Sequence, residues 1–182
     1  MHKFRNKYCT KSTRLQSWDY SNSAYYFVTI CTKNKEKYFG KIADDKMILN
    51  KIGKIAEQFW LEIPSHFPFV ILDEFILMPN HIHGILVFEN NDCRDKALPC
   101  LYMDNVGKNR FQNQGKNTLS SVIGSFKSIC TKTINKIQSE IFFAWQGCFY
   151  DRIIRTEEEL NKVRNYIINN PLKWFEDENF IN

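Results

Sequence analysis

The residues best suited to chemistry are two histidines one position apart, His81 and His83, at the start of the apolar stretch 82–88. This stretch has the composition of a β-strand, and the Pro-Asn pair before it predicts a turn. Strand side chains alternate between faces, so both imidazoles should project from one face, with Ile85 and Val87 further along it. Neutral imidazole is the commonest protein metal ligand, and the pair therefore predicts half of a metal site. The alternative is two ordinary strand-end histidines, one bonded to backbone and one to water.

A tyrosine and an asparagine four residues apart, Tyr166 and Asn170, form the second candidate group. They lie in a helix predicted to begin at Thr156 and to end near Asn170, before Pro171, so they should share one face. A partly exposed tyrosine hydroxyl can attack phosphorus, and the asparagine could add an oxygen ligand to a metal held by the two histidines. Such a mixed nitrogen and oxygen set suits a divalent ion such as Mg²⁺ or Mn²⁺ better than structural zinc. The alternative is that Tyr166 only packs the helix.

The composition is that of a globular protein. With 182 residues, 43% of them hydrophobic and 15% aromatic, the chain is expected to form a single domain over residues 1–182. Its net charge of +5 favours a polyanionic partner but does not require one. The six cysteines lack zinc-finger spacing and are interpreted as reduced thiols of a cytoplasmic protein. No apolar stretch is long enough to cross a bilayer, so a membrane partner and secretion are disfavoured.

Apolar periodicity predicts the elements that would position these side chains. Aromatic and β-branched runs indicate strands, and apolar residues at helical spacing indicate helices packed on a sheet. The strand before the histidines should pair with the histidine strand in a hairpin. The predicted strands are 25–32, 69–77 and part of 142–155, and the predicted helices are 47–63, a long one from Thr118, and the one from Thr156.

Two segments differ from the rest in composition. Residues 1–24 are polar and basic, and form either a solvated tail or an arm that contacts phosphates. Residues 89–117 show little periodicity and are predicted to be a mobile loop within the domain. On the helix from Thr118, Lys127 and Lys132 lie off the apolar stripe, either on a solvated face or lining a nucleic-acid groove.

Three motifs occur in order along the chain: Met-Pro-Asn-His-x-His-Gly, Trp-Gln, and Tyr-Ile-x-Asn-Asn-Pro. In this combination they are highly specific, and the sequence resembles the REP-associated tyrosine transposases, a branch of the single-tyrosine HUH endonucleases. The resemblance covers most of the chain apart from the predicted loop. The matching segments are 14–21, 26–32, 72–85, 125–128, 145–146, 149–151, 153–155 and 166–173.

The resemblance implies an α+β, ferredoxin-like domain of the HUH endonuclease type, with helices packed on a central antiparallel sheet and the histidines on a central strand. It also implies that His81, His83 and Asn170 bind the metal and that Tyr166 is the nucleophile. Tyr150 is the rival nucleophile, but only Tyr166 has an amide ligand one turn away. Family members carry a histidine at the position of Arg152, which here becomes a candidate phosphate contact.

The implied activity is metal-dependent cleavage and joining of single-stranded DNA near hairpin, repetitive palindromic sequences, through a covalent 5′-phosphotyrosine link. The cofactor would be Mg²⁺ or Mn²⁺, and the enzyme a monomer or a homodimer. Two alternatives remain: a domesticated DNA-hairpin-binding protein that no longer cleaves, and a metal-dependent phosphohydrolase that uses the histidine pair and a metal-bound water. Because both histidines, the tyrosine and the asparagine are present, the active enzyme is favoured. The candidate DNA contacts are Arg14, Trp18, Tyr20, Lys127, Lys132, Tyr150, Arg152 and Arg155.

Overall fold

The structure is a computed structural model that describes residues 18–89, 117–138, 140 and 142–180. It also gives the backbone of two short strands, β1 (Lys3–Phe4) and β2 (Lys7–Tyr8), which pair antiparallel. Arg14, most of the predicted arm and residues 90–116 of the predicted loop lie outside the described residues. Within the described part of the chain, no helix is both long and apolar enough to span a membrane.

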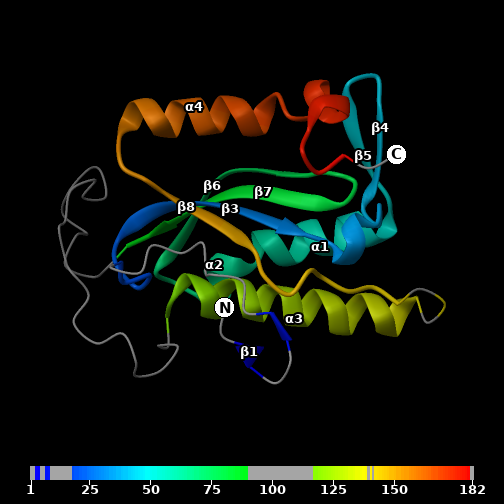
Figure 1. The fold of residues 1–182 in the computed structure, drawn as a ribbon, viewed down its shortest axis with the longest axis horizontal. Helices are drawn as coiled ribbons and strands as arrows, with labels where there is room; N and C mark the ends of the chain where they lie inside the picture. The colour runs from blue at the N-terminus through cyan, green and yellow to red at the C-terminus, as the bar shows by residue number, and fades with distance from the viewer. Residues whose placement is uncertain are drawn as a thin grey trace.

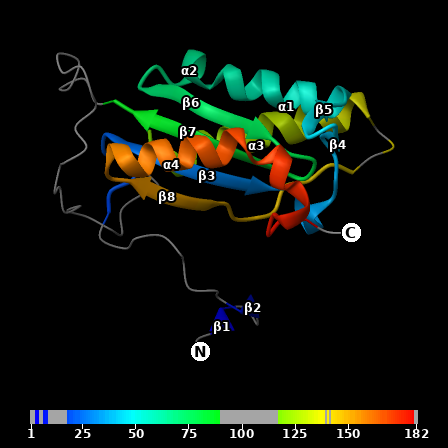
Figure 2. The same ribbon diagram turned by 90° about the horizontal axis from the view of Figure 1, so that it is seen from above.

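A four-stranded antiparallel sheet forms the middle layer, and Figure 2 shows its strands side by side in the order β6, β7, β3, β8. The two central strands are the predicted strand near residue 25 and the histidine strand, and every residue of the latter is buried. The prediction that the histidines lie on a central strand is therefore confirmed. The strands are β3 (Ala24–Cys31), β6 (Val70–Leu77), β7 (His81–Phe88) and β8 (Tyr150–Ile154).

Helices cover both faces of this sheet, as Figure 1 shows. On one face lie α1 (Lys51–Leu61), the short α2 (Ile63–His66) and the long α3 (Leu119–Ile137). On the other face lies α4 (Glu157–Ile168), followed by the 3₁₀ helix η3 (Pro171–Glu176). The strand order, with α1 and α3 crossing one face, is that of a ferredoxin-like domain, and α4 adds a third layer. The predicted α+β, ferredoxin-like fold is confirmed.

The predicted start of the first helix is wrong, and the cause is local. The helix expected over 47–63 begins only at residue 51, because Asn50 caps it by accepting a hydrogen bond from the Gly53 N–H at 3.0 Å. The residues before Asn50 form β5 (Lys46–Leu49), which pairs with β4 (Gly40–Ala43) in a hairpin. A 3₁₀ turn, η1 (Lys33–Lys35), follows β3.

The predicted strand in 142–155 is shorter than expected. Only Tyr150–Ile154 joins the sheet, and the preceding residues run along α3 with a single bridge between Trp145 and Thr32. Trp145 is buried and donates its indole N–H to the Lys127 carbonyl at 3.2 Å. This segment therefore packs against a helix, which explains why its aromatic residues do not extend the sheet.

The larger core cluster fills the space between the sheet and the α1–α3 layer. It includes the fully buried Trp60, whose ring meets Phe126 edge to face at 5.3 Å between centroids. Gly84 on β7 lies under this indole, and a Cβ there would overlap the ring. A methyl group forced into a filled core costs about 1–3 kcal/mol. We therefore expect Gly84→Ala to lower the free energy of unfolding by that amount, measured by urea denaturation.

A second glycine provides the matched control for this prediction. On the exposed face of α3, a Cβ at Gly124 would meet nothing within 4 Å. Alanine is favoured over glycine in a helix interior by about 0.8–1 kcal/mol, so Gly124→Ala should stabilise the protein. Equal destabilisation by the two variants would show that the Trp60 contact is not the cause.

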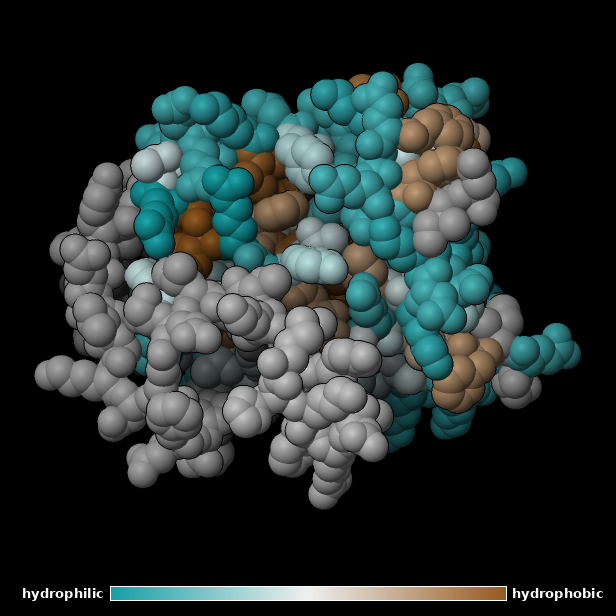
Figure 3. Space-filling view, viewed as in Figure 1, coloured by the Kyte–Doolittle hydropathy of each residue, from teal (hydrophilic) through white to brown (hydrophobic). Residues whose placement is uncertain are grey.

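The smaller core cluster holds α4 against the opposite face of the sheet, around Ile85 and Ile167. In Figure 3, hydrophilic side chains cover the outer side of α4, and apolar ones show below it, where the helix meets the sheet. An ion pair adds to this contact: Arg164 donates to the Asp73 carboxylate on β6 through Nε at 2.8 Å and through a terminal nitrogen at 2.5 Å. The pair therefore joins the last helix to an edge strand.

Removing this ion pair should loosen α4. Burial alone would raise the pKa of Asp73, but the hydrogen bonds from Arg164 outweigh it and hold the pKa below its usual value. Arg164→Ala should cost about 1–2 kcal/mol, less than a fully buried pair because the guanidinium is partly solvated. The contribution is complete above the unfolded-state pKa of about 3.9 and is lost as the pH falls through the lowered pKa. Urea titrations at pH 7 and below pH 4 would measure it, and a pH-independent cost would contradict the assignment.

Candidate active site

Strand register positions the candidate catalytic side chains on the α4 face of the sheet. On β3, Thr29 pairs with His83 of β7 on one side and with Tyr150 of β8 on the other. His81 pairs with Cys31 two residues further along the same strands. Because residues two apart on a strand share a face, both histidines and Tyr150 project toward the side that α4 covers. The predicted side-by-side arrangement of the imidazoles is therefore confirmed.

Each imidazole is oriented through its Nδ1 atom by a neighbouring oxygen. His83 Nδ1 lies 2.9 Å from Thr29 Oγ1, and His81 Nδ1 lies 2.8 Å from Asn80 Oδ1. The Asn80 amide nitrogen donates to the carbonyls of Lys35 and Asn179, so its oxygen is left to accept from His81. His81 must then carry its proton on Nδ1, which leaves a lone pair on Nε2. Such supporting contacts are typical of metal-binding histidines.

The Nε2 atom of His81 is a buried acceptor that has no hydrogen-bond partner among the described residues. The residue is fully buried, and its ring lies 4.4 Å from that of His83 between centroids. Burial, and then the neighbouring His83, lower the pKa of His81 to about 3. His81 therefore stays neutral at physiological pH, which is the protonation state that a metal ligand needs.

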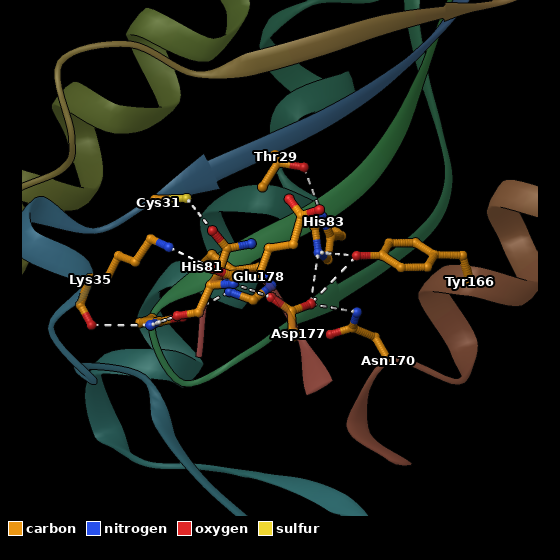
Figure 4. A network of polar contacts seen from close by, with 11 residues as sticks. Thr29, Cys31, Lys35, His81, His83, Tyr166, Asn170, Asp177 and Glu178 are labelled. Carbon is orange, nitrogen blue, oxygen red and sulfur yellow. Dashed lines mark hydrogen bonds and ion pairs between the residues drawn. The ribbon is translucent and has the colours of Figure 1, made fainter. Parts of the chain in front are cut away.

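Tyr166 and Asn170 reach the histidines from the end of α4, as Figure 4 shows. The Tyr166 hydroxyl lies 3.2 Å from His83 Nε2, although the residue as a whole is 45% exposed. Burial of the hydroxyl, and then the nearby carboxylate of Asp177, raise the pKa of Tyr166 to about 12. Asn170 is buried, and its Oδ1 atom likewise has no partner within the described residues. The structure thus brings together the four residues that the sequence singled out.

Asp177 completes the group, and the sequence analysis missed it. Its Oδ2 atom lies 3.4 Å from the Tyr166 hydroxyl, 3.1 Å from Asn170 Nδ2 and 3.9 Å from His83 Nε2. Burial alone would raise the pKa of Asp177, but the neighbouring His83 imidazole and a hydrogen bond from the Asn179 N–H hold it far below its usual value. Asp177 follows η3, which is anchored by the buried Trp174. The one signal in the sequence is the acidic run 176–178, and its position depends on the turn before it.

The donor atoms of this cluster fit a divalent metal ion. The ligand atoms of His81, His83 and Asp177 all lie within 4.8 Å of one another. Within the described residues, Asn170 Oδ1 and His81 Nε2 are buried acceptors that no donor reaches, a costly arrangement unless a cation or a water binds them. Two imidazoles with a carboxylate and an amide oxygen form a mixed nitrogen and oxygen set, as predicted for Mg²⁺ or Mn²⁺.

His83, Asn170 and Asp177 line a pocket of about 750 Å³ between α4, the sheet and the segment after η3, whereas the fully buried His81 does not line it. Tyr166 lines this pocket, and so do Tyr150 and Arg152 of the edge strand β8. The Arg152 side chain is 70% exposed and forms an ion pair with Glu159 at 2.5 Å. Tyr150 and Arg152, two of the candidate DNA contacts, therefore line the same pocket as three of the candidate metal ligands.

The other described DNA-contact candidates do not line this pocket. Trp18 donates its indole N–H to the Tyr26 hydroxyl at 3.0 Å, and Tyr20 stacks on the Tyr26 ring, so both aromatic residues pack against the core. Lys127 donates to the carbonyls of residues 146 and 147 at 2.6 and 3.2 Å. Lys132 is exposed on α3, and Arg155 is exposed at the end of β8.

No family model matches this chain. A protein of Haemophilus influenzae described as uncharacterized is 37% identical over 172 residues, which are 94% of this chain and 93% of that protein. Among solved structures, a REP-associated tyrosine transposase bound to a REP hairpin has a TM-score of 0.54 at 15% identity, covering 96% of this chain and 74% of its own. A putative transposase from Deinococcus radiodurans has a TM-score of 0.45 at 11% identity, covering 93% of this chain and 97% of its own. The first of these structures shows that this chain shares its fold.

Proposed function

Because this chain belongs to one family with the Haemophilus influenzae protein and has the fold of a REP-associated tyrosine transposase, we propose that it is a transposase-like enzyme. It cleaves and joins single-stranded DNA near hairpin sequences through a covalent 5′-phosphotyrosine link. One observation carries the proposal: the hydroxyl of Tyr166 contacts His83 within a buried cluster of metal-ligand atoms. A nucleophile directly beside such donors is the arrangement that phosphoryl transfer needs.

In this proposal, His81, His83, Asn170 and Asp177 hold Mg²⁺ or Mn²⁺. When bound, the ion polarises a phosphate oxygen and offsets the charge that develops on it. His83 Nε2, now in contact with the Tyr166 hydroxyl, would exchange that contact for the metal and release the hydroxyl toward the pocket. With its pKa raised to about 12, the Tyr166 phenol is protonated at neutral pH, so the attacking oxygen must lose its proton during the step.

The chemical step exchanges one ester bond for another. The phenol oxygen of Tyr166 forms a bond to phosphorus, and the bond from phosphorus to the DNA 3′ oxygen breaks. The phenol loses its proton and the 3′ oxygen gains one, so no net proton change occurs and no ATP is consumed. Arg152, which lines the pocket, would pair with a non-bridging phosphate oxygen after leaving Glu159.

A denaturing gel tests this function directly. The purified protein would be mixed with Mn²⁺ or Mg²⁺ and with labelled single-stranded hairpins taken from the DNA that flanks its own gene. We expect a slowly migrating, protease-sensitive adduct that a metal chelator abolishes. Cleavage without an adduct would overturn the proposal in favour of a phosphohydrolase that activates water. Binding without cleavage, once the metal and the hairpin had been varied, would instead indicate a DNA-binding protein.

A further inference from the structure

A second hollow lies outside the candidate active site, between α3 and the extended segment 144–149. We call it the α3 groove; it encloses about 640 Å³. Its floor is the exposed side of α3 around Gly124, where even a Cβ would meet nothing within 4 Å. The polar side chains of Ser128 and Thr131 continue this floor along the helix. From residue 120 to residue 132 the floor is about 18 Å long, enough for several nucleotides.

The α3 groove carries positive charge. Lys127 and Lys132 both line it, and within the described residues no acidic side chain does. The Lys127 ammonium group already donates hydrogen bonds to the carbonyls of Gln146 and Gly147. These bonds hold the segment that forms the wall of the groove. Lys132 is exposed on the outer turn of α3. The Phe149 ring adds an apolar side.

The groove adjoins the candidate active site. Gln146 lines both the α3 groove and the pocket that contains Tyr166. The backbone N–H of Gln146 donates to the Cys31 carbonyl at 2.9 Å, and Cys31 is the register partner of His81. The wall between the two hollows is therefore one extended segment, tied to the sheet beside the metal-ligand cluster.

We infer that the α3 groove binds the single-stranded part of the DNA substrate and leads it over Gln146 to the scissile phosphate. This inference rests on the proposed function and names where its substrate is held. Lysine and hydroxyl groups bind phosphates regardless of sequence. Phe149, which is half-buried against the core, lines the opposite side of the groove. A strand in the groove would meet Lys132 and Ser128 on the helix side and Phe149 on the other.

Filling the groove tests this inference. Gly124→Trp places an indole in the open floor, whereas Gly124→Ala adds a Cβ that meets nothing and serves as the matched control. Fluorescence anisotropy would compare a blunt hairpin with the same hairpin carrying a single-stranded tail. For the wild type and Gly124→Ala, we expect the tail to tighten binding about tenfold, the effect of one or two ordered nucleotides. Gly124→Trp should lose that tail preference and keep its affinity for the blunt hairpin.

A second variant tests the inference in case Gly124→Trp does not fold. Lys132→Glu changes only an exposed charge, and it should reduce the tail preference and flatten its dependence on salt concentration. The inference would be overturned if either variant kept the wild-type tail preference and unfolded at the wild-type temperature. This holds even if the adduct still formed. Conversely, loss of the preference in a protein that forms no adduct would support the groove and contradict the proposed cleavage.

Discussion

Replacing Tyr166 by phenylalanine should reduce formation of the protein–DNA adduct by at least about 10³-fold, because it removes the attacking oxygen. The substitution is conservative for the fold. The Tyr166 ring meets Phe27 edge to face at 6.0 Å between centroids, a contact that phenylalanine keeps. Within the described residues, the hydroxyl contacts the site residues His83 and Asp177. Thermal stability and hairpin affinity should therefore stay within error of the wild type, and the loss should appear only on the denaturing gel.

Tyr150→Phe is the matched control, because Tyr150 lines the same pocket and is 54% exposed. Tyr150 lies two strands from His83 in the same row of the sheet, about 10 Å away between Cα atoms. Tyr166, by contrast, already contacts His83 through its hydroxyl. We expect Tyr150→Phe to keep the adduct, with at most a weaker affinity for DNA. An adduct that survives in Tyr166→Phe and vanishes in Tyr150→Phe would make Tyr150 the nucleophile.

The parts of the site that the sequence predicted are those set by local periodicity. His81 and His83 share a face because a strand repeats every two residues, and Tyr166 and Asn170 share one because a helix repeats every 3.6. The capping residue Thr156 also fixed the start of α4, since it accepts from the Glu159 N–H at 3.1 Å. These patterns hold within one element, and so they can be predicted without knowing how the elements pack.

The parts that the sequence did not predict depend on packing between distant segments. Asp177 reaches the histidines only because Pro171 and Trp174 bury η3 against the site, with Trp174 6.0 Å from His81 between ring centroids. The β4–β5 hairpin before α1 was not predicted because the apolar residues of β5 also fit helical spacing. Only the Asn50 cap marks where the strand ends and the helix begins. Trp18 and Tyr20 were predicted as DNA contacts, but the sequence cannot reveal that both pack on Tyr26.

Asp177→Asn should weaken Mn²⁺ binding by at least about tenfold, because it removes the carboxylate from the proposed ligand set and leaves two imidazoles and amides. The shape of the side chain is kept, and the remaining carbonyl oxygen can still accept from the Asn179 N–H. Electron paramagnetic resonance of free Mn²⁺ during a titration would measure the affinity without DNA. The readout is therefore independent of whether the protein cleaves anything.

Glu178→Gln is the control for this prediction, because it removes the same unit of charge one residue away. Glu178 also lines the pocket, but it lies outside the group of ligand atoms that His81, His83 and Asp177 form. If long-range charge alone attracts the cation, both variants should weaken Mn²⁺ binding equally, and salt should screen the effect. If Asp177 ligates, only its own variant should lose affinity. Wild-type affinity in Asp177→Asn, combined with lost affinity in Asn170→Ala, would assign the oxygen ligand to Asn170 and leave Asp177 a positioning residue for Tyr166.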